Sequence, residues 1–155
     1  MIRFRLNGRD VEVDVPVTAR LLDVLRDSCG DTSVKEACGE GECGACLVLR
    51  DGEPVNSCIL PAALADGCEI ITIEGLRQTP RGRALINAFA REGAVQCGFC
   101  IPGMVMAADA FLRRNSAPTD GAIREGISGN LCRCTGYDLI VRAISAAARE
   151  GKGLW

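Results

Sequence analysis

The chain has 155 residues, a formal net charge of −2 and 48% hydrophobic residues, a composition typical of a globular protein. So small a charge favours neither a nucleic acid nor an anionic membrane as partner. No apolar run approaches the roughly 18 residues of a membrane-spanning helix. The first residues, MIRFRLNGRD, contain no apolar signal segment, so we expect a cytoplasmic protein.

The first part of the chain predicts a small sheet crossed by one helix. Two pairs of strands are expected, because Asn7-Gly8 and Asp51-Gly52 favour tight hairpin turns between apolar, alternating segments. Thr18 is the expected N-cap of a short helix over residues 19–27. The expected strand segments are 2–6, 11–15, the two arms of 47–57, and the β-branched run 69–73.

The remainder of the chain predicts a helical bundle. After Gly75 the segment LRQTPRG is typical of a linker, and alternation of β-branched residues ends there. Apolar residues then recur at helical spacing over 84–91, 102–114, 120–127 and 139–149. We therefore expect an α+β protein with a first domain over 1–75, a linker over 76–80 and an all-α domain over 81–155.

Eight of the ten cysteines fall into two sets of four, and the chain has no histidine. The first set has the spacing C-x4-C-x2-C-x11-C, which is that of plant-type ferredoxins holding a 2Fe-2S cluster. The second set has the spacing C-x2-C-x31-C-x1-C. The first set is Cys38, Cys43, Cys46 and Cys58, and the second is Cys97, Cys100, Cys132 and Cys134. Two thiolate sites predict two metal centres.

Two other uses of the cysteines need consideration. Structural zinc also accepts four thiolates, and the second set taken alone fits zinc as well as a cluster. A disulfide scaffold is disfavoured, because nothing directs the chain to an oxidising compartment and its length is sufficient for an ordinary core. Cys29 and Cys68 lie outside both sets, and we expect them to be small buried apolar residues rather than ligands.

The glycines of CGEGECGAC spell G-x-G-x-x-G, the dinucleotide-binding pattern, at Gly39, Gly41 and Gly44. The context does not fit, because the motif follows a predicted helix, is interleaved with cysteines and carries two glutamates where a pyrophosphate would lie. These glycines instead favour a loop with positive φ that wraps a cluster and directs backbone amides at its sulfurs.

The cysteine motifs closely resemble those of the molybdenum hydroxylases, in their iron-sulfur subunits and N-terminal domains. This family includes xanthine dehydrogenase, aldehyde oxidoreductase, carbon monoxide dehydrogenase and 4-hydroxybenzoyl-CoA reductase. The matching stretches are EACGEGECGAC, VNSC, QCGFCIPGM and GNLCRCTGY. The resemblance implies a β-grasp ferredoxin-like domain followed by a four-helix domain, each with one 2Fe-2S cluster.

The resemblance also implies partner subunits. A large subunit would hold a molybdopterin cofactor next to the cluster of the second cysteine set. A medium subunit would hold FAD next to the cluster of the first set, or another electron acceptor would take that place. Gln96 matches a family residue that contacts the pterin, although its sequence position alone fits an ordinary surface amide.

The function expected from these features is electron transfer without substrate chemistry on this chain. No catalytic set that needs histidine can form, and four thiolates leave a cluster no open position for substrate. The alternatives are a free-standing ferredoxin-type carrier, which would need only the first domain, and a zinc-stabilised interaction module, which would be colourless.

Overall fold

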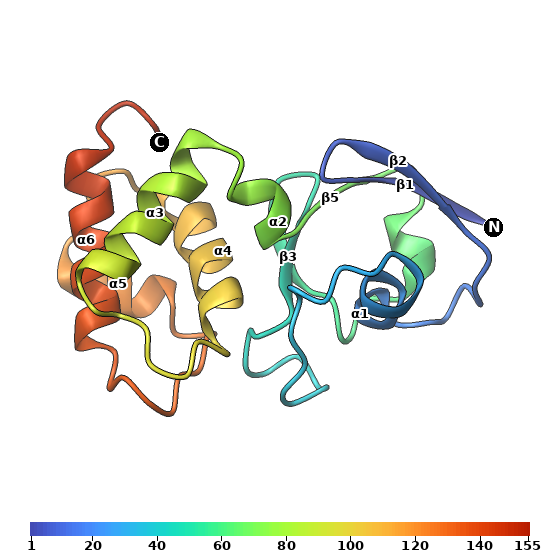
Figure 1. The fold of residues 1–155 in the computed structure, drawn as a ribbon, viewed down its shortest axis with the longest axis horizontal. Coiled ribbons are helices and arrows are strands. Elements are labelled where there is room, and N and C mark those ends of the chain that lie inside the picture. Colours follow the sequence, from blue (N-terminus) through green and yellow to red (C-terminus); the bar gives the residue numbers. More distant parts are fainter.

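A computed structural model describes all 155 residues, and it has the predicted α+β architecture (Figure 1). A five-stranded sheet with α1 lies at the N-terminal end of the molecule, and helices α3 to α6 lie at the other end, with β3 between them. The strands are β1 (Ile2–Leu6), β2 (Arg9–Val13), β3 (Leu47–Arg50), β4 (Glu53–Asn56) and β5 (Glu69–Ile71).

The helical elements account for most of the second half of the chain. The α-helices are α1 (Leu21–Asp23), α2 (Ile73–Leu76), α3 (Pro80–Arg91), α4 (Ile101–Leu112), α5 (Asp120–Gly126) and α6 (Asp138–Glu150). A π-helical segment, η1 (Val24–Ser28), and a short 3-10 helix, η2 (Ala62–Ala65), complete the secondary structure. No helix combines the length and apolar character required to cross a membrane.

The sheet has the strand order β2-β1-β5-β3-β4, in which only β1 and β5 run parallel. Both predicted hairpins are confirmed. Asn7 and Gly8 have φ of 51° and 81°, and Asp51 and Gly52 have φ of 48° and 84°. Positive φ at both central residues is the condition for a type I′ turn, whose twist matches that of paired strands.

Strand β3 joins the two halves because its alternating side chains enter different cores. Val48 belongs to the core formed by the sheet and α1, whereas Leu49 belongs to the core of the helical half. Helix α4 packs against β3 and β4 on that second side. The two halves therefore share a buried contact along β3, so their relative orientation is set by side-chain packing.

Several predicted boundaries were wrong. The strand expected over 11–15 spans Arg9–Val13. Thr18 does not cap the first helix: the N-cap is Arg20, which makes no side-chain cap bond, and the helix widens into η1. The last strand ends at Ile71, because Thr72 caps α2 instead. Helix α3 begins at Pro80, with the Thr79 hydroxyl accepting a bond from the Gly82 amide.

Helix α4 is the central helix of the bundle and is buried on nearly every side. Met104 and Met106 are both 0% exposed, so these residues are core and do not face a partner. A helix that is apolar all round is expected at the centre of a bundle. The bundle itself forms the larger of the two buried clusters in the chain.

Asp109 is the one buried carboxylate of α4, with a side chain that is 0% exposed. Its two oxygens accept bonds from Arg81 Nε at 2.9 Å and Arg113 Nε at 3.2 Å. Trp155 Nε1 lies 3.4 Å from the same carboxylate. Arg113 also donates to the carbonyl of Gly52 at 2.5 Å, which links α4 to the second hairpin.

We expect Asp109→Asn to lower the free energy of unfolding by about 3 kcal/mol, because two arginines lose the charge that compensates them at a buried site. Asp10→Asn is the matched control, since Asp10 is exposed and its pair with Arg5 should contribute at most about 1 kcal/mol. Urea titration of both variants provides the measurement. Equal losses for the two variants would contradict this role of Asp109.

Candidate metal centres

The loop between η1 and β3 carries Cys38, Cys43 and Cys46, and Cys58 follows β4. Glu40 N lies 3.5 Å and Glu42 N 3.4 Å from Cys38 Sγ, and each donates to that sulfur. The amide of Gly41 donates to Cys58. The loop adopts this shape because Gly39, Gly41 and Gly44, as predicted, all have positive φ, at 69°, 83° and 73°.

These amides act electrostatically on the cysteines of the first set. The hydrogen bond from the Glu40 amide, with those from the amide and thiol of Cys43, lowers the pKa of Cys38 to about 6. Burial, with the neighbouring Cys46, raises the pKa of Cys58 to about 12. A thiol such as Cys58 ionises at neutral pH when a cation binds its sulfur, which is the chemistry of a metal ligand.

The second cysteine set lies in the loops at one end of the helical bundle. Cys97 and Cys100 lie between α3 and α4, and Cys132 and Cys134 lie between α5 and α6. The sulfurs of Cys97 and Cys134 are 3.5 Å apart. Cys97 and Cys134 are exposed, whereas Cys100 and Cys132 are half-buried. One side of this set therefore faces outward.

The two half-buried cysteines of the second set have opposite pKa shifts. Burial, with the adjacent Cys132 thiol, raises the pKa of Cys100 to about 12. Burial by itself would raise the pKa of Cys132 too, but hydrogen bonds from Thr135 and Cys134 lower it. The Thr135 hydroxyl lies 3.1 Å from Cys132 Sγ, and the Cys132 amide donates to the Tyr137 hydroxyl at 2.9 Å.

In both sets, a neighbouring thiol contributes to the pKa shift of one member of each pair. Cys43 lowers the pKa of Cys38, Cys46 raises that of Cys58, Cys132 raises that of Cys100, and Cys97 raises that of Cys134. No group of three or more cysteine or carboxylate side chains converges on a single ion position. A 2Fe-2S cluster takes two thiolates on each of its two irons, so the donor type and the pairing both fit it.

The two cysteine sets are linked directly through the backbone. The amide of Leu131, the residue before Cys132, donates to the carbonyl of Cys43 at 2.9 Å. The side chain of Asn130 donates to the carbonyl of Gly44 at 3.2 Å. The bond between Leu131 and Cys43 thus connects the first cysteine set to the residue that precedes Cys132 of the second set.

Comparison with known proteins agrees with this two-part organisation. Residues 4–70 match the family model of the 2Fe-2S iron-sulfur cluster binding domain, and residues 72–145 match that of the 2Fe-2S binding domain. The nicotinate dehydrogenase small FeS subunit of Eubacterium barkeri is 48% identical over 96% of this chain and 95% of its own length. The chain belongs to the small iron-sulfur subunits of the molybdenum hydroxylases.

Further relatives of this iron-sulfur subunit agree in sequence and in structure. The xanthine dehydrogenase iron-sulfur-binding subunit of Escherichia coli O157:H7 is 44% identical over 92% of this chain and 91% of its own length. A chain of quinoline 2-oxidoreductase from Pseudomonas putida 86 has a TM-score of 0.90 at 44% identity, with 96% of this subunit and 93% of that chain covered. Aldehyde oxidoreductase from Desulfovibrio desulfuricans ATCC 27774 has a TM-score of 0.89 at 37% identity, and the match covers 99% of this subunit but only 18% of that longer chain.

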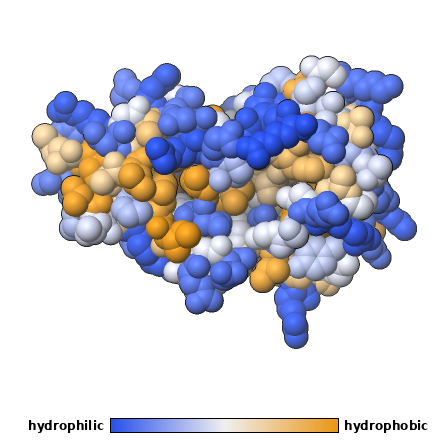
Figure 2. All heavy atoms as spheres, turned by 180° about the vertical axis from the view of Figure 1, so that it is seen from behind, coloured by the Kyte–Doolittle hydropathy of each residue, from blue (hydrophilic) through white to orange (hydrophobic).

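Exposed apolar residues of the iron-sulfur subunit occur next to both cysteine sets. Phe99 and Leu131 are 45% and 56% exposed beside the second set, and Ile59 directly follows Cys58. Seen from behind, apolar residues form a band across the middle of the molecule (Figure 2). Such residues beside a proposed cofactor site are suited to a protein partner.

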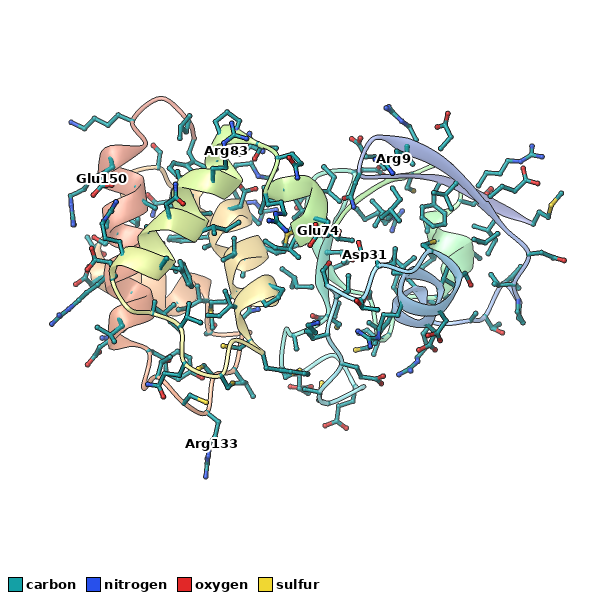
Figure 3. The ribbon with its side chains drawn as sticks, in the orientation of Figure 1. Arg9, Asp31, Glu74, Arg83, Arg133 and Glu150 are labelled. Carbon is teal, nitrogen blue, oxygen red and sulfur yellow. The ribbon has the colours of Figure 1, made fainter.

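Two polar residues of interest in the iron-sulfur subunit lie at the edge of the second set. Gln96 is exposed next to the exposed Cys97. Arg133, between Cys132 and Cys134, extends away from the helical half (Figure 3). Neither position tests a contact with a partner cofactor, so the role of Gln96 stays a prediction.

Sequence reasoning missed three polar residues that shape the two sites. Asn56 donates to the carbonyl of Gly41 at 2.8 Å and so ties β4 to the first cysteine loop. Thr135 donates to Cys132, and Asn130 joins the two loops. All three lie within two or three residues of a cysteine, which is the one signal in the sequence that could have identified them. Cys29 and Cys68, expected to be buried, are each partly exposed.

Proposed function

We propose that this chain relays electrons one at a time between a molybdopterin site on a large subunit and a flavin or other acceptor. In this proposal the first cluster is held by Cys38, Cys43, Cys46 and Cys58, and the second by Cys97, Cys100, Cys132 and Cys134. A 2Fe-2S cluster supplies one-electron redox chemistry when bound. Support for these ligands comes from the paired thiols of each set.

The chain's own residues would prepare each site in different ways. The amides of Glu40 and Glu42 place positive dipole ends against Cys38 and so stabilise negative charge there. At the second site the Thr135 hydroxyl does the same for Cys132. Hydrogen bonds to ligand sulfurs are one of the factors that set a cluster's reduction potential, so the two sites should differ in potential.

The observation that carries the proposal is the hydrogen bond from the Leu131 amide to the Cys43 carbonyl. It makes a short bonded route from a proposed ligand of one site, Cys43, to a proposed ligand of the other, Cys132. A free-standing ferredoxin needs one site only, and a zinc module needs no route between its two metals. A chain that passes electrons between two centres is served by such a connection.

The exposed side of the second site supports the assignment of a partner there. Cys97 and Cys134 are exposed at the second site, with Phe99 and Leu131 beside them, which fits contact with a molybdopterin-binding subunit. We further propose that Gln96 contacts the pterin there, that domains 1–75 and 81–155 are joined by a linker over 76–80, and that the complex is cytoplasmic.

The test is purification of the tagged chain from its native cells, followed by identification of the associated subunits and measurement of iron, molybdenum and flavin. We expect a stable complex that contains molybdenum and iron. Recovery of the chain alone, carrying iron but free of any partner in its native cells, would contradict the subunit role and favour a free-standing carrier.

A further inference from the structure

We propose that Asn130 is a positioning residue for electron transfer between the two cysteine sets. Its side chain holds the carbonyl of Gly44, so that the adjacent carbonyl of Cys43 stays aligned with the amide of Leu131. The inference rests on the proposed function, because it concerns the route by which electrons pass between the two sites. It assigns a role to a residue that ligates no metal.

The contact of Asn130 with the first cysteine loop is close and buried. Asn130 is 6% exposed, and its Nδ2 lies 3.2 Å from the Gly44 carbonyl oxygen. The same oxygen accepts a bond from the Leu47 amide at 3.2 Å. The backbone of Asn130 is fixed in turn by its amide, which donates to the carbonyl of Ile127 at 2.9 Å. Both ends of this contact are therefore held in place.

Gly44 is enclosed from two sides by the helical half. A Cβ atom on Gly44 would lie 2.4 Å from Asn130 Nδ2 and 2.7 Å from the Gly129 carbonyl oxygen. A Cβ atom on Gly103, in the first turn of α4, would lie 2.1 Å from the Gly44 oxygen. No side chain fits in either gap, so the backbone of the loop lies directly against both segments.

The bond between Leu131 and Cys43 has little protection of its own. Leu131 is 56% exposed, and Cys43 is only half-buried. A hydrogen bond near the surface competes with water, so its net contribution is small unless neighbouring contacts hold its partners in place. Asn130 supplies such a contact, because it directly precedes Leu131 and bonds to Gly44, which directly follows Cys43.

The experiment compares Asn130→Ala with Asn87→Ala in the full chain carrying its clusters. Asn87 is exposed on α3 and lies outside both loops, which makes it a matched control. Two quantities are measured: hydrogen exchange of the backbone amides over 129–133, and the rate at which an electron equilibrates between the two sites after partial photoreduction. Iron content and the electron paramagnetic resonance (EPR) signal of each site are recorded in parallel.

For Asn130→Ala we expect exchange at Leu131 to be about tenfold faster. Electron equilibration between the two sites should be about tenfold slower, because the Cys43 carbonyl and the Leu131 amide would no longer be aligned. Small displacements of positioned groups slow other reactions by similar factors. Both EPR signals should keep their shape, and Asn87→Ala should match the unaltered chain. Unchanged exchange and equilibration rates in Asn130→Ala would overturn the proposal.

Asn130→Asp is the second variant, because it keeps the size of the side chain and removes the donor. If both variants lose their clusters altogether, Asn130 has a purely structural role and the proposal is wrong. The exchange measurement also separates this inference from the proposed function. A chain that carries no 2Fe-2S signal would contradict the proposed function, whereas slow, Asn130-dependent exchange at Leu131 would still establish the contact.

Discussion

Cys132→Ala is expected to leave the chain with one cluster in place of two. Iron should fall from about four to about two per chain, because a 2Fe-2S cluster that loses one of four thiolates loses an iron ligand that no neighbouring side chain replaces. Cys132 is also the cysteine that Thr135 and Tyr137 hold in place. Iron and sulfide analysis with EPR spectroscopy of the reduced chain gives the measurement.

Two further substitutions complete the test of the ligand assignment. Cys43→Ala should remove the other EPR signal and keep the one that Cys132→Ala removes. Cys68→Ala is the control, because Cys68 lies outside both sets and contacts Arg50, so it should keep about four irons. Retention of both signals in Cys132→Ala would show that the ligand assignment is wrong.

Gly103→Ala is expected to disrupt the junction between the two halves of the chain. The added Cβ would lie 2.1 Å from the Gly44 carbonyl oxygen and 3.2 Å from Ala45 Cα, and both are backbone atoms that have no rotamer to change. The clash can therefore be removed only if α4 moves away from the loop that carries Gly44 and Ala45. We expect the free energy of unfolding to fall by about 3 kcal/mol, as in other overpacked sites.

Gly121→Ala is the matched control for Gly103→Ala. Gly121 also lies in a helix, α5, but an added Cβ there meets nothing closer than the Thr119 hydroxyl at 3.9 Å. Alanine should therefore stabilise that helix by up to about 1 kcal/mol. Urea titration of the two variants decides the matter, and a Gly103→Ala chain as stable as Gly121→Ala would mean that the two halves do not meet at Gly44.

The elements with strong local signals could be predicted from the sequence. Asn7-Gly8 and Asp51-Gly52 determine both hairpins, because each pair accepts positive φ. Thr119 accepts a bond from the Ala122 amide and caps α5, the role that a threonine directly before a helical segment favours. In these segments local propensity and tertiary packing favour the same structure.

The wrong boundaries have identifiable physical causes. The start of α3 was placed too late because its apolar spacing is visible only from Ala84, whereas the signal that matters is the Thr79-Pro80 pair at the cap. The π-helical turn at η1 depends on the bond from the Cys29 amide to the Val24 carbonyl, and residue spacing does not distinguish it from an α-turn.

At the candidate sites, too, one part could be predicted from the sequence and another could not. Cysteine spacing identified both sets, because a cluster constrains the separation of its ligands along the chain. The junction between the sets could not be predicted, since Asn130 and Gly44 are 86 residues apart and their contact follows from the packing of α4 on β3. Long-range contacts of this kind leave no periodic pattern in the sequence.

The most direct test of the central claim is quantification of metal and sulfide in the isolated full chain, together with EPR spectroscopy after dithionite reduction. The account predicts about four irons, about four sulfides and two distinct 2Fe-2S signals per chain. A colourless protein with about two zinc ions and no EPR signal would contradict it and would make both cysteine sets structural.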